Sequence, residues 1–178
     1  MSEQVILVDN NDNEIGTMAK LEAHQKGILH RAFSVFIFNS KGEMLLQQRA
    51  LNKYHSGGLW SNACCSHPFP GENIIDAAKR RLMEEMGIKA DLQHIYSFIY
   101  NVQLDNELSE HEFDHVLIGI CNEIPFVNQD EILNWKYVTI PKLLEDIQIK
   151  PTTYTSWFRI CINNVLDKMR LETNDQCT

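Results

Sequence analysis

A thiol, an imidazole and several carboxylates lie close together in the middle of this sequence. The run Ser61-Asn-Ala-Cys-Cys-Ser-His67 is followed by an acidic segment that ends at Gly87. A thiol can donate a proton or act as a nucleophile near neutral pH. An imidazole binds metals or carries protons, and clustered carboxylates bind hard cations. Together these residue types indicate an active site.

Three histidines and a pair of glutamates are candidate metal ligands. We expect His24, His30 and His67 to be exposed, because they lie in segments rich in Gly, Pro or polar residues. Glu110 and Glu112 are two residues apart, so an extended backbone places both side chains on one face. Imidazoles with one or two carboxylates suit Zn²⁺ or Mn²⁺, whereas oxygen ligands alone suit Mg²⁺. Spacing alone is a weak signal, because a single surface histidine or Glu-x-Glu pair is usually an ordinary solvated one.

The basic residues have a structural explanation as well as a functional one. Arg80 with Glu84, and Arg81 with Glu85, have the i,i+4 spacing of ion pairs that stabilise a helix. Ordinary surface charge is the alternative explanation for Lys20, Arg49 and Lys53. Trp157 is more often a core residue than a ligand contact at such a position.

Composition limits the class of protein. With 178 residues and 44% hydrophobic content, the chain can bury one substantial core, so we expect a single domain over residues 1–178. A formal charge of -8 argues against nonspecific binding to nucleic acid or to an anionic membrane. Any phosphate ligand must therefore be held by a local pocket.

Localisation and thiol state follow from two other features. The first residues form neither a basic nor an apolar leader, and no apolar run approaches the roughly 18 to 20 residues that span a bilayer. We therefore expect a cytoplasmic protein without a membrane partner. The odd set of cysteines lacks framework spacing, which predicts reduced thiols at Cys64, Cys65, Cys121, Cys161 and Cys177.

Hydrophobic periodicity predicts the elements that must position these groups. Apolar runs predict strands at 5–8, 33–38 and 44–48, the last two joined by a turn at 39–42. Helical spacing predicts a helix over 73–86 with Gly87 at its C′ position. Strands are expected at 95–104 and 116–121, with turn-rich sequence between them, and helices at 141–147 and 155–171. This order predicts an α/β (α+β) fold with a mixed β-sheet sandwiched by helices in one compact domain.

The final helix is expected to be amphipathic and to close the domain. The residues near its one apolar face are Trp157, Ile160, Cys161, Val165 and Met169.

The segment from Ser66 to Ile88 resembles the Nudix box, Gly-x5-Glu-x7-Arg-Glu-U-x-Glu-Glu-x-Gly-U, where U is aliphatic. Ser66 stands in place of the opening Gly, and Arg81 in place of the Glu after Arg80. The second departure removes one carboxylate from the metal-binding helix, which weakens the case for diphosphate hydrolysis.

Nearly the whole chain is similar to type 1 isopentenyl-diphosphate isomerases, which have the Nudix fold. The segments and residues that carry this resemblance are 30–36, 45–49, 60–68, 84–87, Tyr100, 110–112 and Trp157. The Cys-Cys-Ser-His-Pro run with a downstream Glu-x-Glu is much more specific than the degenerate box.

The resemblance implies a function and a role for each candidate residue. The activity would be conversion of isopentenyl diphosphate to dimethylallyl diphosphate, with Cys65 and Glu112 as catalytic pair and Tyr100 hydrogen-bonded to one of them. The implied ligands of a divalent metal, Zn²⁺ or Mn²⁺, are His24, His30, His67, Glu110 and Glu112. Glu85 would hold a Mg²⁺ bridged to the diphosphate. The residues implied to bind the substrate are Lys20, Arg49, Lys53, Arg81 and Trp157.

Two other functions are compatible with parts of the pattern. A Nudix hydrolase of another diphosphate would need the full box, and a noncatalytic metal-stabilised binding module would leave Cys65 without a role. The small-molecule diphosphate is the one partner expected, the oligomeric state is open, with a monomer possible, and no role is assigned to Cys64.

Overall fold

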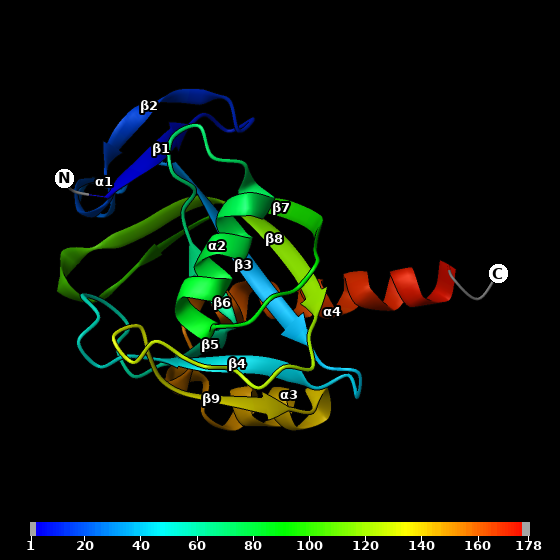
Figure 1. The fold of residues 1–178 in the computed structure, drawn as a ribbon. Coiled ribbons are helices and arrows are strands. Elements are labelled where there is room, and N and C mark those ends of the chain that lie inside the picture. Colours follow the sequence, from blue (N-terminus) through cyan, green and yellow to red (C-terminus); the bar gives the residue numbers. More distant parts are fainter. Residues whose placement is uncertain (1–2, 176–178) are drawn as a thin grey trace.

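The chain folds into a mixed β-sheet with helices on both faces (Figure 1). The structure is a computed structural model that describes residues 3–175, with the backbone alone for 170–175. The elements, in chain order, are β1 (Gln4–Val8), β2 (Glu14–Ala19), α1 (Lys20–Lys26), β3 (His30–Phe38), β4 (Met44–Arg49), β5 (Trp60–Asn62), β6 (Cys64–Ser66), α2 (Ile74–Met86), β7 (Leu92–Gln103), β8 (Ser109–Ile120), β9 (Ile132–Val138), α3 (Ile140–Ile149) and α4 (Ser156–Asp175). Short 3₁₀ turns lie at Asp105–Glu107 and Pro151–Thr153. The predicted architecture is confirmed.

Strand β3 is the one on which the sheet is built. It pairs antiparallel with β1, β4 and β6 and parallel with β8. β2 adds to β1, β7 adds to β8, and β5 and β9 both add to β4. Since helices cover both faces of β3, its sequence from Ala32 to Phe38 is almost continuously apolar, with Ser34 as the exception.

Alternate residues of β3 enter two separate cores. Phe33, Val35 and Ile37 pack in the core beneath α2, whereas Phe36 and Phe38 pack in the core beneath α3 and α4. Figure 1 shows α2 in front of the sheet and α4 behind it. The period of two in a strand therefore assigns each side chain of β3 to one layer.

Helix α2 begins and ends as the sequence predicts. The Asn73 side chain accepts a hydrogen bond from the Ile75 N–H at 2.9 Å, which caps the first turn. Gly87 ends the helix at φ +65°, and a Cβ there would lie 2.4 Å from the Phe126 carbonyl oxygen. Both the left-handed backbone and the close approach require glycine.

The structure contains elements that periodicity did not predict, among them β2, α1 and β9. The predicted turn-rich segment before 116 is confined to the 3₁₀ turn at Asp105–Glu107, and the prediction was wrong beyond it because β8 begins at Ser109. Its polar residues Glu110, Glu112 and Asp114 alternate with more exposed ones and are themselves buried. A strand that turns carboxylates inward lacks the apolar alternation that identifies a strand.

The predicted face of the last helix was wrong at one position. Ile160 is 43% exposed, and the buried face instead includes Phe158 and Ile162 beside Trp157 and Cys161. No helix in residues 3–175 is long and apolar enough to cross a membrane. Cys64, Cys65, Cys121 and Cys161 are free thiols, as predicted, and Cys177 lies outside the described residues.

We predict that the core beneath α4 carries much of the stability. Phe158→Ala should lower the free energy of unfolding by about 3–5 kcal/mol, because Phe158 is fully buried and its loss leaves a cavity. Ile160→Ala, on the exposed side of the same helix, should change it by less than about 1 kcal/mol. Urea unfolding measures both, and equal losses would contradict this assignment of faces.

Candidate active site

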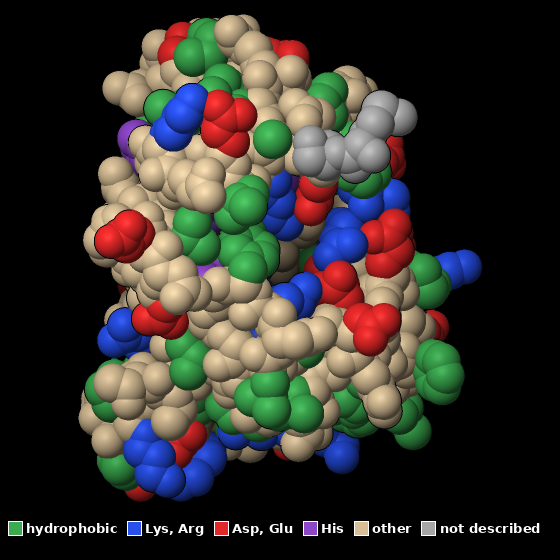
Figure 2. All heavy atoms as spheres, turned by 90° about the vertical axis from the view of Figure 1, so that its left-hand side faces the viewer, with side chains coloured by type: hydrophobic (Ala, Val, Ile, Leu, Met, Phe, Trp, Pro, Cys, Tyr) green, Lys and Arg blue, Asp and Glu red, His purple; other side chains and the backbone are tan. Residues whose placement is uncertain are grey.

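One pocket collects residues from distant parts of the chain. Every site residue predicted from the sequence lines it except His30, whose Nε2 atom lies 3.2 Å from His67 Nε2. Figure 2 shows Lys, Arg, Asp and Glu side chains gathered side by side on the face that contains α1 and the loop 50–58. The predicted set is thus brought together in space.

The two adjacent cysteines point to opposite faces of the sheet. Cys64 is fully buried in the core beneath α2, where burial raises the pKa of its thiol well above the usual value. Cys65 packs on the opposite side, against the core beneath α4, and lines the pocket. The alternation along β6 therefore gives only Cys65 access to a pocket ligand.

The Cys65 thiol is held by hydrogen bonds on several sides. It donates to Asn62 Oδ1 at 3.0 Å, and Trp157 Nε1–H donates to Sγ at 3.1 Å. Ser34 Oγ lies 3.7 Å from the sulfur and donates to Asp114 Oδ2 at 2.8 Å. Burial, with the nearby Asp114 carboxyl, raises the pKa of Cys65 to about 12. The thiol therefore keeps its proton at neutral pH.

Glu110 and Glu112 share one phenol. Tyr100 donates to Glu112 Oε2 at 2.6 Å and to Glu110 Oε2 at 3.2 Å, so the expected hydrogen bond from Tyr100 to one of Cys65 and Glu112 is present. Burial and the Glu112 charge raise the pKa of Glu110 well above its usual value. Although burial opposes ionisation of Glu112, the adjacent His30 and His67 rings hold its pKa well below the usual value. Two neighbouring carboxyls thus differ in protonation state.

The three predicted histidines converge on Glu112, but they are buried, so the expectation of exposure was wrong. His24, His30 and His67 are 1%, 0% and 6% exposed. His67 Nε2 lies 3.0 Å from Glu112 Oε1, and His30 Nε2 lies 3.6 Å from the same oxygen. Their ligand atoms and that of His24 all lie within 4.8 Å of one another. Burial excludes competing water and favours ligation over solvation.

The second ring nitrogen identifies the tautomers. Nδ1 of His24 lies 2.8 Å from the Lys20 carbonyl oxygen, and Nδ1 of His30 lies 2.7 Å from the Ile28 carbonyl oxygen. A carbonyl only accepts, so each Nδ1 carries the hydrogen, and in the neutral ring Nε2 presents a lone pair. This arrangement is typical of histidines that bind a metal, and the residues fit a divalent cation.

Glu85 is the carboxylate of the Nudix-like segment that faces the pocket. It is 4% exposed and accepts from Arg81 at 2.6 Å. Burial raises its pKa even with Arg81 beside it. The other carboxylates of this segment have partners outside the pocket. Glu72 accepts two hydrogen bonds from Arg80, and Glu84 forms ion pairs with Arg80 and Arg81 near the surface. The predicted i,i+4 ion pairs are confirmed.

The basic residues predicted to bind substrate lie around the same opening. Lys53 forms an ion pair with Glu131, Arg81 lies 3.7 Å from Glu131, and Lys20 lies 3.2 Å from Glu3. Nε of Arg49 and Nε of Arg81 are buried without a hydrogen-bond partner. Unpartnered buried donors on two pocket arginines favour an anionic ligand.

Sequence reasoning missed three pocket or network residues. His55 is 5% exposed and faces Glu110, and burial lowers its pKa to about 3. Glu131 faces Lys53 from the loop before β9. Asp114 continues the period of two from Glu110 and Glu112, so that spacing could have identified it, whereas nothing in the spacing identifies His55 or Glu131.

Comparisons with known proteins give a consistent result. Residues 28–158 match the family described as NUDIX domain. The isopentenyl-diphosphate Delta-isomerase of Pectobacterium atrosepticum is 47% identical over 173 residues, which cover 97% of each chain. Isopentenyl-diphosphate Delta-isomerase 2 of Photorhabdus laumondii is 50% identical over 165 residues, 93% of each chain.

Solved structures agree on the fold. A Deinococcus radiodurans protein superposes with a TM-score of 0.68 at 19% identity, over 83% of this chain and 90% of the other. A MutT NUDIX hydrolase from Burkholderia pseudomallei gives a TM-score of 0.60 at 19% identity, over 76% of this chain and 96% of the other. At such identities the likeness establishes the fold and not the reaction.

We predict that removing one imidazole lowers metal affinity. His67→Ala should weaken Zn²⁺ or Mn²⁺ binding at least tenfold, because the remaining ligands are two imidazoles and the carboxylates. Chelator competition and elemental analysis of the purified protein measure this effect. His94→Ala, an exposed histidine outside the pocket, is the control. Unchanged affinity in His67→Ala would exclude His67 from the ligand set.

Proposed function

The chain belongs to the family of isopentenyl-diphosphate Delta-isomerases within the NUDIX domain family, and from this premise we propose that it interconverts isopentenyl and dimethylallyl diphosphate. The observation that carries the proposal is the presence of Cys65 and Glu112 in one pocket with complementary protonation states.

The reaction moves a double bond by adding a proton to one carbon and removing a proton from another. No electron is transferred, so no redox cofactor is required. The reaction therefore needs a protonated group on one side of the alkene and a base on the other side. Burial keeps the proton on Cys65, while His30 and His67 keep Glu112 ionised. A protonated Cys65 and an ionised Glu112 match a reaction in which the enzyme donates one proton to the substrate and accepts another from it.

Tyr100 and Trp157 support the two reacting groups. The Tyr100 hydroxyl orients Glu112 by its 2.6 Å hydrogen bond, and the Trp157 N–H orients Cys65. The Trp157 ring also lines the pocket, where its π face can stabilise a developing tertiary carbocation by about 2 kcal/mol or more in a desolvated site. The Arg49 guanidinium carbon lies 5.2 Å from the ring centroid.

We assign the diphosphate to the basic side of the pocket. The residues proposed to bind it are Lys20, Arg49, Lys53 and Arg81, and the free Nε donors of the two arginines support this assignment. Glu85 is proposed to hold a Mg²⁺ shared with the diphosphate, since carboxylate and phosphate oxygens suit that hard cation. Binding would require Lys53 to exchange Glu131 for substrate oxygens.

The histidine side of the pocket is proposed to bind Zn²⁺ or Mn²⁺. Its proposed ligands are His24, His30, His67, Glu110 and Glu112, and the mixture of nitrogen and oxygen donors suits these ions. A bound cation would supply positive charge that fixes the Glu112 carboxylate and tunes its acidity. The substrate is a small soluble molecule, and we propose that the protein acts in the cytoplasm.

Incubation with isopentenyl diphosphate and Mg²⁺ should yield dimethylallyl diphosphate. In D₂O the product should contain deuterium, because the reaction adds a proton that exchanges with solvent. Product analysis by NMR and a phosphate assay distinguish this outcome from hydrolysis. Release of phosphate without isomerisation would overturn the proposal in favour of a Nudix hydrolase.

The adjacent cysteines provide a matched pair of variants. Cys65→Ala should lower kcat by about 10²–10⁴-fold, which is the usual contribution of a proton-transferring group. Cys64→Ala should stay active, because its side chain faces the core beneath α2. Circular dichroism and diphosphate binding control for folding. The reverse order of activities would mean that Cys65 is not the reacting thiol.

A further inference from the structure

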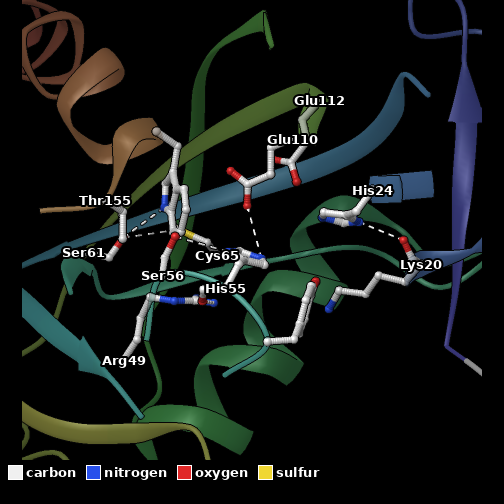
Figure 3. A network of polar contacts seen from close by, with 12 residues as sticks. Lys20, His24, Arg49, His55, Ser56, Ser61, Cys65, Glu110, Glu112 and Thr155 are labelled. Carbon is white, nitrogen blue, oxygen red and sulfur yellow. Dashed lines mark hydrogen bonds and ion pairs between the residues drawn. The ribbon is translucent and has the colours of Figure 1, made fainter. Parts of the chain in front are cut away.

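His55 is a buried imidazole in the pocket for which the proposed metal site has no role. It lies on the loop 50–58 and is 5% exposed. Its Nε2 atom lies 3.6 Å from Glu110 Oε1, and Figure 3 shows the two side chains directed toward each other beneath Glu112. An imidazole so placed beside a buried carboxylate needs an explanation.

The loop backbone is shaped to hold this ring in the pocket. Ser56, directly after His55, has a φ of +52°, a left-handed conformation that is costly for a residue other than glycine. A Cβ on the following residue, Gly57, would lie 2.7 Å from the Leu51 carbonyl oxygen. Arg49 donates to the His55 carbonyl oxygen at 3.2 Å. These restraints fix the direction of the His55 side chain.

The ring nitrogens of His55 have different surroundings. Nδ1 lies 3.3 Å from the Ser56 hydroxyl oxygen, which leaves Nε2 for the pocket. A ring nitrogen of His55, a carboxylate oxygen of Glu110 and a ring nitrogen of His24 all lie within 4.8 Å of one another. Two ligands at about 2.0–2.2 Å from one ion lie at most about 4.4 Å apart. A cation among these three groups needs only small side-chain shifts.

His24 belongs to both groups of converging ligand atoms. It lies with His30, His67 and Glu112 in one group, and with His55 and Glu110 in the other. In this structure Glu110 therefore lies in the group that contains His55. The sequence resemblance instead placed Glu110 among the ligands that include His30, His67 and Glu112. An ion that recruits Glu110 approaches His55 at the same time.

We propose that His55 is a ligand of the metal centre, so that the centre contains four imidazoles and two carboxylates. This inference rests on the proposed metal site and extends it. The additional nitrogen donor would favour a transition ion such as Zn²⁺, Mn²⁺ or Co²⁺ over Mg²⁺, which prefers oxygen ligands. The ligand comes from the loop 50–58, which also carries Lys53, so metal binding and substrate binding would order one segment.

The opposing possibility is that His55 only donates a hydrogen bond to Glu110 and positions it. His55→Gln separates the two, since a glutamine amide can still donate to Glu110 but is a poor ligand for a transition metal. His55→Ala removes both capabilities. His94→Ala again controls for loss of an imidazole elsewhere on the surface.

The test is direct metal binding by the full chain, with Mn²⁺ and Co²⁺ as probes and without substrate. Both His55→Ala and His55→Gln should bind more than tenfold more weakly than the parent. The visible spectrum of bound Co²⁺ should change in both variants. Pulsed EPR of bound Mn²⁺ should detect one imidazole nitrogen fewer. Melting curves of the metal-free variants should match the parent and so exclude misfolding.

Three results would overturn the proposal in distinguishable ways. Parent-like affinity and spectra in both variants would exclude His55 from the centre. Loss in His55→Ala with retention in His55→Gln would make His55 a positioning residue. If His67→Ala also binds metal normally, the proposed metal centre itself fails, and the His55 proposal with it. Isomerase activity, measured separately, reports on the proposed reaction.

Discussion

The pairing of β3 with β6 and with β8 is the constraint on which the site depends. In the parallel β3–β8 ladder His30 lies opposite Glu112, and in the antiparallel β3–β6 ladder Ser34 lies opposite Cys65. The β7–β8 ladder then places Tyr100 opposite Glu112. A shift of one residue in any of these registers would turn a side chain proposed to react to the other face. The apolar residues of β3, which serve both cores, oppose such a shift.

Burial of charge on that face sets the second constraint. Glu110, Glu112 and Asp114 follow one another on one side of β8 and are all nearly inaccessible to water. Such a row is stable only when its members are protonated, hydrogen-bonded or paired with cations. Burial raises the pKa of Asp114 to about 8, so its carboxyl is protonated at neutral pH. Glu112 instead has two imidazoles beside it and stays ionised, so Asp114 and Glu112 differ in protonation state.

The two faces of the sheet divide the chemistry. The groups proposed to move protons, Cys65, Glu112 and Tyr100, lie on the side covered by α4, which contributes Trp157. Glu85 and Arg81 approach from α2 on the other side. The proposed phosphate and alkene ends of one substrate therefore contact different layers of the fold. The MutT NUDIX hydrolase from Burkholderia pseudomallei has a similar fold. The fold therefore does not determine the reaction, which depends on the side chains placed on it.

The sequence by itself determined the helix 74–86 with Gly87 at its end and the hairpin of β3 and β4, because neighbours in sequence decide these features. Nearly all of the predicted pocket residues followed instead from the resemblance of the sequence to a known family. Tertiary structure alone decided that β8 begins among carboxylates, that the three histidines are buried, and that His55 faces Glu110. Those features arise from contacts between segments far apart in the chain, such as His55 and Glu110, which are 55 positions apart, and no local pattern encodes them.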